Sequence, residues 1–519
     1  MARKKALSQE LNPIIKTDYP DPDVIRVQDV YYMISTTMYF MPGGVILRSY
    51  DLCNWEIASY VFESLDDNAN ERLENESSNY AGGMWAASLR YHEGTFYVVF
   101  VSHFTQTTYL FTSKNINGPW EKRTIEGYYH DCSLLFDDDG RVFLTHGNFA
   151  IHLLELDEDL KGPKKGGIDK IIVEEKNDVI LGYEGSHFYK INGKYYLFLI
   201  HWPKEMPGRR TEACFVADNI EGPYIGKDIF NDDRNYCGQG VAQGGIVDTP
   251  AGKWYAVMFQ DSGAVGRMPV LVPMKFEEDF PVLGVDGKTP DKFNVGTSRP
   301  YYKYEPLYTS DSFIPENEEE LKVLKKQWQW NHCPNNKLWT LLPEGGLQIK
   351  TGKLSTNLTH AQNCLTQRMM FPRCEAEVTV DATMIKDQDV VGLCALQGRY
   401  GYLAVTREGG NYYLIKVVNN DTEPMKIGGG GNYLPGDVVE KIRLQSPIVT
   451  LCLKAEFTDM QDRLDFFYLK GDKFVKVGES HKLIFGLDHF TGARFGLFIF
   501  SMRETGGSAV FKDFVYRYE

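Results

Sequence analysis

The sequence predicts an all-β protein: a five-bladed β-propeller over residues 1–305, followed by a β-sandwich over residues 306–519. Three observations predict this. The 519 residues exceed the usual size of one domain. Aromatic and apolar strands recur at a loose period in the first part of the chain, as in a propeller. Short alternating strands without that period fill the second part, which favours a sandwich.

The propeller is predicted from five strands that each follow a polar turn, as the second strand of a β-hairpin does. They begin 65, 46, 53 and 59 residues apart, which is the size of one propeller blade. They lie at residues 31–35, 96–100, 142–146, 195–199 and 254–258. A second motif is shared by residues 113–120 and 217–224, as outer strands of two blades would be. Five blades would end near residue 300.

A linker is predicted where the strand pattern lapses into Gly, Asp, Lys and Pro at residues 284–300. The one convincing helical stretch follows at residues 316–325. Beyond it, segments such as 376–380, 402–405 and 495–500 alternate or run apolar, with glycine-rich turns between strands. These features place the domain boundary near residue 305.

Composition excludes several classes of partner. The net charge of −14 would repel phosphate backbones and anionic membranes, so nucleic acid and membrane are not expected partners. The basic start at residues 1–5 is followed by no apolar run, so we expect no signal peptide and a cytoplasmic protein. Nine cysteines without metal-type spacing indicate free thiols. The oligomeric state is left open.

Three carboxylates precede the inner strands of three predicted blades. Asp21 lies ahead of the first, Asp131 ahead of the third and Glu184 ahead of the fourth. Inner strands of a propeller begin around one central funnel, so these side chains are expected to converge. Inverting glycoside hydrolysis needs a carboxylic acid and a carboxylate base roughly 6.5–9.5 Å apart. The trio can supply both, with Asp131 as the negative charge that keeps Glu184 protonated.

Each carboxylate also has a structural interpretation. Asp21 stands between prolines, where aspartate commonly forms a turn. Asp131 could bind backbone amides at a strand end, and Glu184 could lie in a solvated turn. Equivalent positions in three blades make the functional interpretation stronger for the set than for any one member.

These segments resemble glycoside hydrolase family 43 along nearly the whole chain. Residues 19–23 (YPDPD) resemble the family's opening segment, which implies that Asp21 is the general base. Residues 130–134 (HDCSL) resemble the segment with the pKa-modulating aspartate, here Asp131. Residues 184–187 (EGSH) are similar to the segment with the general acid, here Glu184.

The resemblance also implies substrate-binding residues. Residues 82–89 resemble the segment whose tryptophan lines the sugar pocket, here Trp85, and residues 266–267 resemble the segment whose arginine holds sugar hydroxyls, here Arg267. Without the resemblance, Trp85 could be a core residue and Arg267 a surface charge. Many relatives have a histidine near a central water cluster or calcium where this chain has Gln243. No cofactor is expected, and a structural calcium is left open.

The second half resembles the sandwich of two-domain β-xylosidases and arabinofuranosidases, in which a sandwich loop blocks one side of the funnel. The expected function is an inverting exo-glycosidase that removes terminal β-D-xylosyl or α-L-arabinofuranosyl residues from oligosaccharides. The alternatives are an endo-arabinanase and a carbohydrate-binding propeller without catalysis. A retaining fructosidase would need an Arg-Asp-Pro segment and a Glu-Cys acid, whereas this chain has residues 130–132 (HDC) and 184–185 (EG).

Overall fold

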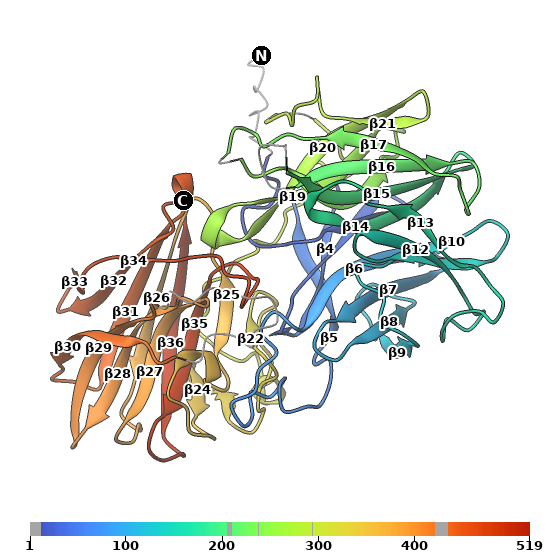
Figure 1. The fold of residues 1–519 in the computed structure, drawn as a ribbon. Helices are drawn as coiled ribbons and strands as arrows, with labels where there is room; N and C mark the ends of the chain where they lie inside the picture. The colour runs from blue at the N-terminus through green and yellow to red at the C-terminus, as the bar shows by residue number, and fades with distance from the viewer. Residues whose placement is uncertain (1–11, 205–209, 237, 293, 421–433) are drawn as a thin grey trace.

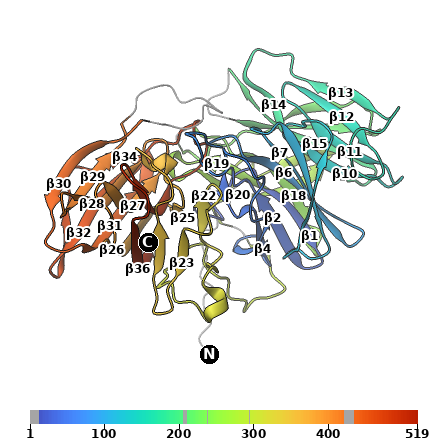
Figure 2. The ribbon, with the colours of Figure 1, turned by 90° about the horizontal axis from the view of Figure 1, so that it is seen from below.

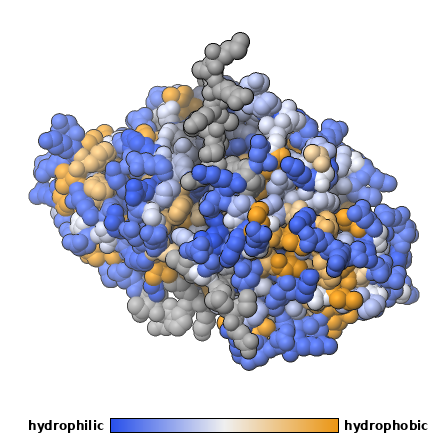
Figure 3. All heavy atoms as spheres, turned by 90° about the horizontal axis from the view of Figure 1, so that it is seen from above, coloured by the Kyte–Doolittle hydropathy of each residue, from blue (hydrophilic) through white to orange (hydrophobic). Residues whose placement is uncertain are grey.

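The protein is described here by a computed structural model over residues 12–204, 210–236, 238–292, 294–420 and 434–519. Two β-rich lobes lie side by side, the propeller in blue to green and the sandwich in yellow to red (Figure 1). The same arrangement is seen from below in Figure 2. Hydrophilic residues cover most of the upper face, with apolar residues in smaller groups between them (Figure 3), as is usual for a folded protein. The predicted all-β fold with a five-bladed propeller and a sandwich is confirmed.

Five antiparallel four-stranded sheets form the blades. The first contains β1 (Asp23–Val27), β2 (Val30–Ser35), β4 (Gly43–Ser49) and β5 (Glu56–Phe62). The second contains β6 (Met84–His92), β7 (Thr95–Ser102), β8 (Thr107–Ser113) and β9 (Glu121–Ile125). The third contains β10 (Ser133–Phe136), β11 (Val142–His146), β12 (Ala150–Leu156) and β13 (Asp169–Glu174). The fourth contains β14 (Val179–Ile191), β15 (Lys194–Pro203), β16 (Thr211–Ala217) and β17 (Ile225–Phe230). The fifth contains β18 (Ala242–Asp248), β19 (Trp254–Asp261), β20 (Arg267–Glu277) and β21 (Phe280–Leu283).

The ring of blades closes where β18 meets β1. The Gly245 amide donates to the Pro22 carbonyl at 2.9 Å. A Cβ atom at Gly245 would lie 2.7 Å from the Asp23 carboxylate and 2.9 Å from the Val24 amide nitrogen, closer than real Cβ contacts. Only glycine therefore lets the last inner strand approach the first, and this approach brings all five strand starts around one centre.

The sandwich consists of two large antiparallel sheets that enclose the largest apolar core of the molecule. One sheet contains β22 (Gln329–Asn331), β25 (Leu365–Arg368), β27 (Asp389–Leu396), β28 (Gly401–Glu408), β29 (Asn411–Val418), β30 (Asp437–Arg443) and β35 (Arg494–Ser501). The other contains β23 (Trp339–Leu341), β24 (Leu347–Lys350), β26 (Arg373–Asp381), β31 (Ile448–Glu456), β32 (Arg463–Lys470), β33 (Lys473–Lys476), β34 (His481–Lys482) and β36 (Ser508–Tyr518).

One strand from the propeller half belongs to a sandwich sheet. The short strand β3 (Phe40–Met41) follows the second strand of blade one in the chain, yet it pairs with β22. The paired residues are Trp330 with Met41 and Asn331 with Phe40. Backbone hydrogen bonds thus join the two lobes directly, which fixes the sandwich relative to the start of blade one.

The prediction of a helix at residues 316–325 is wrong. Only a 3₁₀ turn, η2 (Glu318–Glu320), forms there, with the Asn317 side chain accepting from the Glu319 amide. Four of the five residues 316–320 are glutamates, and like charges on adjacent turns disfavour an α-helix. The other 3₁₀ turns are η1 (Gly263–Val265), η3 (Leu358–His360) and η4 (Thr458–Met460).

Two further predictions concern the compartment and the thiols. In the part of the chain that the structure covers, no helix is long and apolar enough to cross a membrane. The eight cysteines at positions 53, 132, 214, 333, 364, 374, 394 and 452 are free thiols. Cys237 and the basic start at residues 1–5 lie outside the described residues.

Candidate active site

The three predicted carboxylates stand at irregular backbone positions: Asp21 and Asp131 lie two residues before β1 and β10, and Glu184 lies within β14. Asp21 and Asp131 have positive φ angles of 53° and 47°, and Gly185, directly after Glu184, has 67°. The pairing of β14 with β15 shifts register on both sides of Glu184, so this residue lies in a bulge. Bulges and left-handed residues turn a side chain out of the regular strand alternation. This local geometry aims the carboxylates away from the blades.

Asp21 is a buried carboxylate that accepts hydrogen bonds on both oxygens. The Thr36 hydroxyl donates to Oδ2 at 2.7 Å, and Nη1 of Arg267 donates to Oδ1 at 3.1 Å. Thr36 follows β2 of the same blade, whereas Arg267 opens β20 of blade five. The two donors hold the carboxylate in one orientation.

Asp131 and Glu184 meet beside His130. A ring nitrogen of His130 and one carboxylate oxygen each of Asp131 and Glu184 all lie within 4.8 Å of one another. Nε2 of His130 is 3.4 Å from Oε2 of Glu184 and 3.7 Å from Oδ2 of Asp131. The Gly185 amide donates to Oδ2 of Asp131 at 3.1 Å, and the Asn148 amide group donates to Oε2 of Glu184. Two carboxyl groups and one imidazole therefore form a single cluster of contacts.

The charges of this cluster shift two pKa values. Burial raises the pKa of Asp131 to about 6; the negative charges of Glu184 and Asp21 add to the rise, and His130 opposes it. The negative charge of Asp21 therefore acts on Asp131 as well. Burial disfavours the charged imidazole, but Asp131 and Glu184 outweigh it and raise the pKa of His130 to about 9. His130 is therefore a cation at neutral pH.

Trp85 lies against this cluster. Its ring stacks on His103 at 4.7 Å and meets His130 edge to face at 5.5 Å. Its indole nitrogen donates to the Ala81 carbonyl at 3.1 Å, which fixes the ring. Like Glu184, Trp85 lies in a bulge, between Met84 and Ala87 of β6. The side chain is partly exposed, so it is not a fully buried core residue.

A sandwich residue completes this surface, and the sequence did not identify it. Phe490, in the loop between β34 and β35, lies edge to face with Trp85 at 6.0 Å. Its carbonyl accepts from Nη2 of Arg267 at 3.3 Å, and the Arg267 guanidinium lies 4.5 Å from its ring centre. Neither spacing nor periodicity singles out one phenylalanine of thirty. Only the packing of the two lobes does.

The other two predicted substrate residues have well-defined partners. Arg267 is fully buried between Asp21 and Phe490, and its Nε atom has no hydrogen-bond partner among the described residues. The backbone amide of Gln243 donates to the buried carboxyl group of Glu212 at 2.8 Å. A Cβ atom on Gly185 would lie 3.1 Å from the Gln243 side chain. Gln243 thus borders the Glu184 bulge, and Arg267 lies on the Asp21 side.

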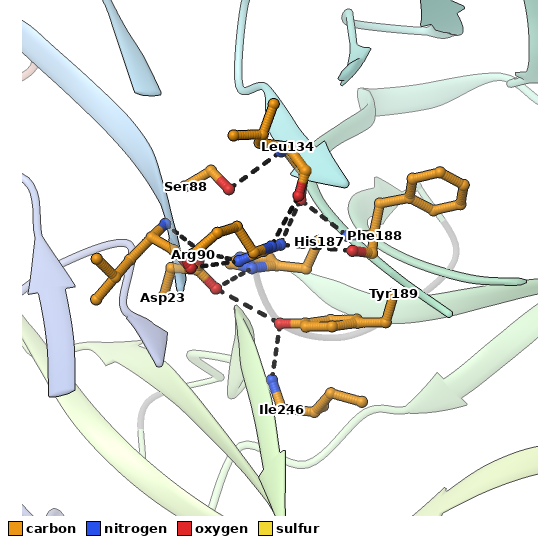
Figure 4. A network of polar contacts seen from close by, with 10 residues as sticks. Asp23, Ser88, Arg90, Leu134, His187, Phe188, Tyr189 and Ile246 are labelled. Carbon is orange, nitrogen blue, oxygen red and sulfur yellow. Dashed lines mark hydrogen bonds and ion pairs between the residues drawn. The ribbon is translucent and has the colours of Figure 1, made fainter. Parts of the chain in front are cut away.

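Beneath these residues the centre of the propeller is filled by Arg90 (Figure 4). Its guanidinium donates to Asp23 Oδ2 at 2.6 Å, the Ser133 hydroxyl at 2.8 Å and the Leu134 carbonyl at 2.8 Å. His187 and Tyr189 contact the other oxygen of Asp23. Both oxygens of Asp23 are therefore engaged within the protein, one of them by the built-in cation Arg90.

Comparison with known proteins identifies the family. Residues 11–281 match the family model for glycosyl hydrolases family 43, and residues 319–517 match the model for the β-xylosidase C-terminal concanavalin A-like domain. The chain belongs to glycoside hydrolase family 43. It is a glycoside hydrolase, as predicted from the motifs, and its substrate is an oligosaccharide.

Relatives of this family 43 chain include proteins with both domains. A protein named β-xylosidase from Formosa agariphila is 27% identical over 98% of this chain and 90% of its own length. Xylosidase/arabinosidase 43B of Humicola insolens is 27% identical over 98% of both chains. A solved structure described as a bifunctional GH43-CE protein from Bacteroides eggerthii is 38% identical, with a TM-score of 0.89. This chain covers 64% of that longer protein, and 98% of this chain is matched.

Proposed function

We propose that this family 43 enzyme is an inverting exo-glycosidase that removes terminal β-D-xylosyl or α-L-arabinofuranosyl units from xylan-derived or arabinoxylan-derived oligosaccharides. The proposal is carried by Asp21, which accepts hydrogen bonds from Thr36 and Arg267, together with Asp131 and Glu184, whose carboxylate oxygens lie within 4.8 Å of each other and of the His130 ring nitrogen. An acid and a base of different character are what inversion requires.

Glu184 is proposed as the general acid. The contacts to His130 and Asn148 both fall on its Oε2 atom, and no hydrogen bond from a described residue reaches Oε1. That oxygen is available to a leaving group. The Glu184 side chain is the more exposed of the two, at 18% against 6% for Asp131, which supports Glu184 as the member of the pair that meets the leaving group. Asp131 acts through its charge on Glu184.

Asp21 is proposed as the general base. Its two donors fix the orientation of a carboxylate that can accept a proton from water. In one step the bond between the anomeric carbon and the glycosidic oxygen breaks while a bond from the water oxygen forms on the opposite face. The leaving oxygen takes the proton of Glu184, and Asp21 takes the proton of the water. Exchange with solvent then restores both groups.

The exo preference is proposed from the sandwich loop. Phe490 and Trp85 meet edge to face, and Phe490 is tied to Arg267 through its carbonyl. A loop from the second lobe therefore stands at the side of the catalytic residues and leaves less room for a continuing chain. The proposed choice of sugars is consistent with relatives named β-xylosidase and xylosidase/arabinosidase. Trp85, Arg267 and Gln243 are proposed to contact the bound sugar.

Asp21→Asn tests the base. The variant keeps the shape of the side chain but cannot accept a proton, so turnover of aryl xyloside and aryl arabinofuranoside should fall by roughly 10²–10⁴-fold. Proton NMR of the sugar released by the wild type should show the anomer opposite to that of the substrate. Release of the same anomer would overturn inversion, and near-normal turnover by Asp21→Asn would remove Asp21 from the base role.

A further inference from the structure

We propose that His130 is a positioning residue for the acid: its imidazolium bridges Asp131 and Glu184 and stabilises Glu184 as an anion once the proton has left. This inference rests on the proposed function and adds a fourth member to the trio. Nε2 of His130 lies 3.4 Å from one carboxylate and 3.7 Å from the other. The same nitrogen therefore lies within hydrogen-bond distance of Glu184 and within ion-pair distance of Asp131.

The charge count of one turnover gives the reason. The proposed acid role requires Glu184 to hold a proton before the step, so with Asp131 ionised and His130 cationic the cluster is then neutral. After the step, two carboxylates face each other within 4.8 Å of the same imidazole. Arg267 is paired with Asp21 and does not compensate this second charge. Without His130 the departing proton would leave two adjacent uncompensated anions, which is costly in a partly buried site.

Neighbouring residues hold the His130 ring in this position, and the histidines near it are not themselves cations. Trp85 packs edge to face against it, with 61° between the ring planes. Two other histidines face it from blades two and three. Burial, with the charge of His130, lowers the pKa of His103, and burial, with His152 and His130, lowers the pKa of His146 to about 4. Both neighbours are therefore neutral at pH 7, and the remaining titratable groups facing His130 are Asp131, Glu184 and, beyond them, Asp21.

His130→Gln is the test, because glutamine can donate a hydrogen bond but carries no charge. Turnover of unactivated xylo-oligosaccharides should fall by about 10-fold or more, while aryl glycosides with good leaving groups lose less. The basic limb of the pH profile should move to higher pH by roughly 0.5–1 unit, because a carboxyl pair without the cation holds its proton longer. Asp131→Asn should move the same limb to lower pH, since it removes an anion.

The matched control is His103→Gln, which removes a ring from the same stack without touching either carboxylate. Its basic limb should stay at the wild-type position. Equal losses on both substrate classes in His130→Gln, with an unmoved basic limb, would show a merely structural role and overturn the inference. If wild-type enzyme releases no sugar or retains configuration, the proposed function fails instead.

A measurement on the wild type keeps the inference testable if His130→Gln does not fold. In full-length protein with labelled histidines, one ring should titrate well above pH 7 by NMR, and this ring should respond to Asp131→Asn. A responding ring that titrates below pH 7 would overturn the proposal, because such a ring is neutral under working conditions.

Discussion

At the scale of single residues, the site depends on charges that differ between neighbours of the same chemical type. Asp21 accepts hydrogen bonds from Thr36 and Arg267, whereas burial raises the pKa of Asp131 to about 6. The sequence placed both aspartates correctly before their strands. It could not predict their different environments. Arg267, which contacts Asp21, comes from another blade, and His130 takes its place beside Asp131 only when their loop folds.

Glu184→Gln is the residue-scale prediction for the acid. The amide keeps the contacts to His130 and Asn148 but has no proton to give, so natural oligomers should lose about 10²–10⁴-fold in kcat. Aryl glycosides with acidic leaving groups need little protonation and should lose far less. Steady-state kinetics on the two substrate classes measure the ratio. The same loss on both would contradict the acid role of Glu184.

At the scale of elements, bulges in three inner strands and one loop of the sandwich position the residues of the site. The bulges in β6, β14 and β18 lie at Trp85, Glu184 and Gln243, so three inner strands are interrupted where the site is built. The loop between β34 and β35 is tied to the propeller by the Gly492 amide, which donates to Asp18 at 2.8 Å, and by Phe490. A repeat in the sequence reveals strands, but a bulge leaves no periodic signal.

Phe490→Ala tests the loop. Removing a ring that packs on Trp85 and Arg267 should raise KM for aryl xyloside by about 10-fold, since an aromatic contact contributes roughly 0.5–1.5 kcal/mol beyond its buried area. Cleavage within longer chains should rise relative to release of single sugars, as chromatography of products would show. Phe485→Ala, which removes a neighbouring ring of the same loop, is the control and should keep the wild-type product pattern. An unchanged pattern in Phe490→Ala would separate this ring from exo specificity.

At the scale of the whole molecule, a buried ion pair between Arg90 and Asp23 lies at the propeller centre and joins blades one and two. Burial alone would raise the pKa of Asp23, but Arg90, with help from His187, lowers it to about 2. This pair stabilises the fold fully above the ordinary carboxyl pKa of about 4, and the contribution is lost as the pH falls toward 2. Because its partners come from several blades, the pair stabilises the ring as a unit.

Arg90→Met should therefore destabilise the propeller by about 3–5 kcal/mol at pH 7, because it leaves a buried carboxylate unpaired. Urea unfolding at several pH values measures this. The difference from wild type should shrink as the pH is lowered from 7 to 3, where a proton can replace the guanidinium. Arg26→Met is the matched control, since its pair with Asp248 is partly exposed and should contribute less than about 1 kcal/mol. A similar loss in both variants would contradict the central role.

The sequence by itself determined the fold class, the family motifs and the positions of Asp21, Asp131 and Glu184, because strand repeats and short motifs are local along the chain. Only the tertiary structure decided that His130 bridges two carboxylates, that Phe490 reaches the site and that Arg90 fills the centre. Each of these depends on distances between segments far apart in sequence, or on which neighbours desolvate a charge. Such distances are set by blade closure at Gly245 and by the pairing of β3 with β22, which local patterns do not encode.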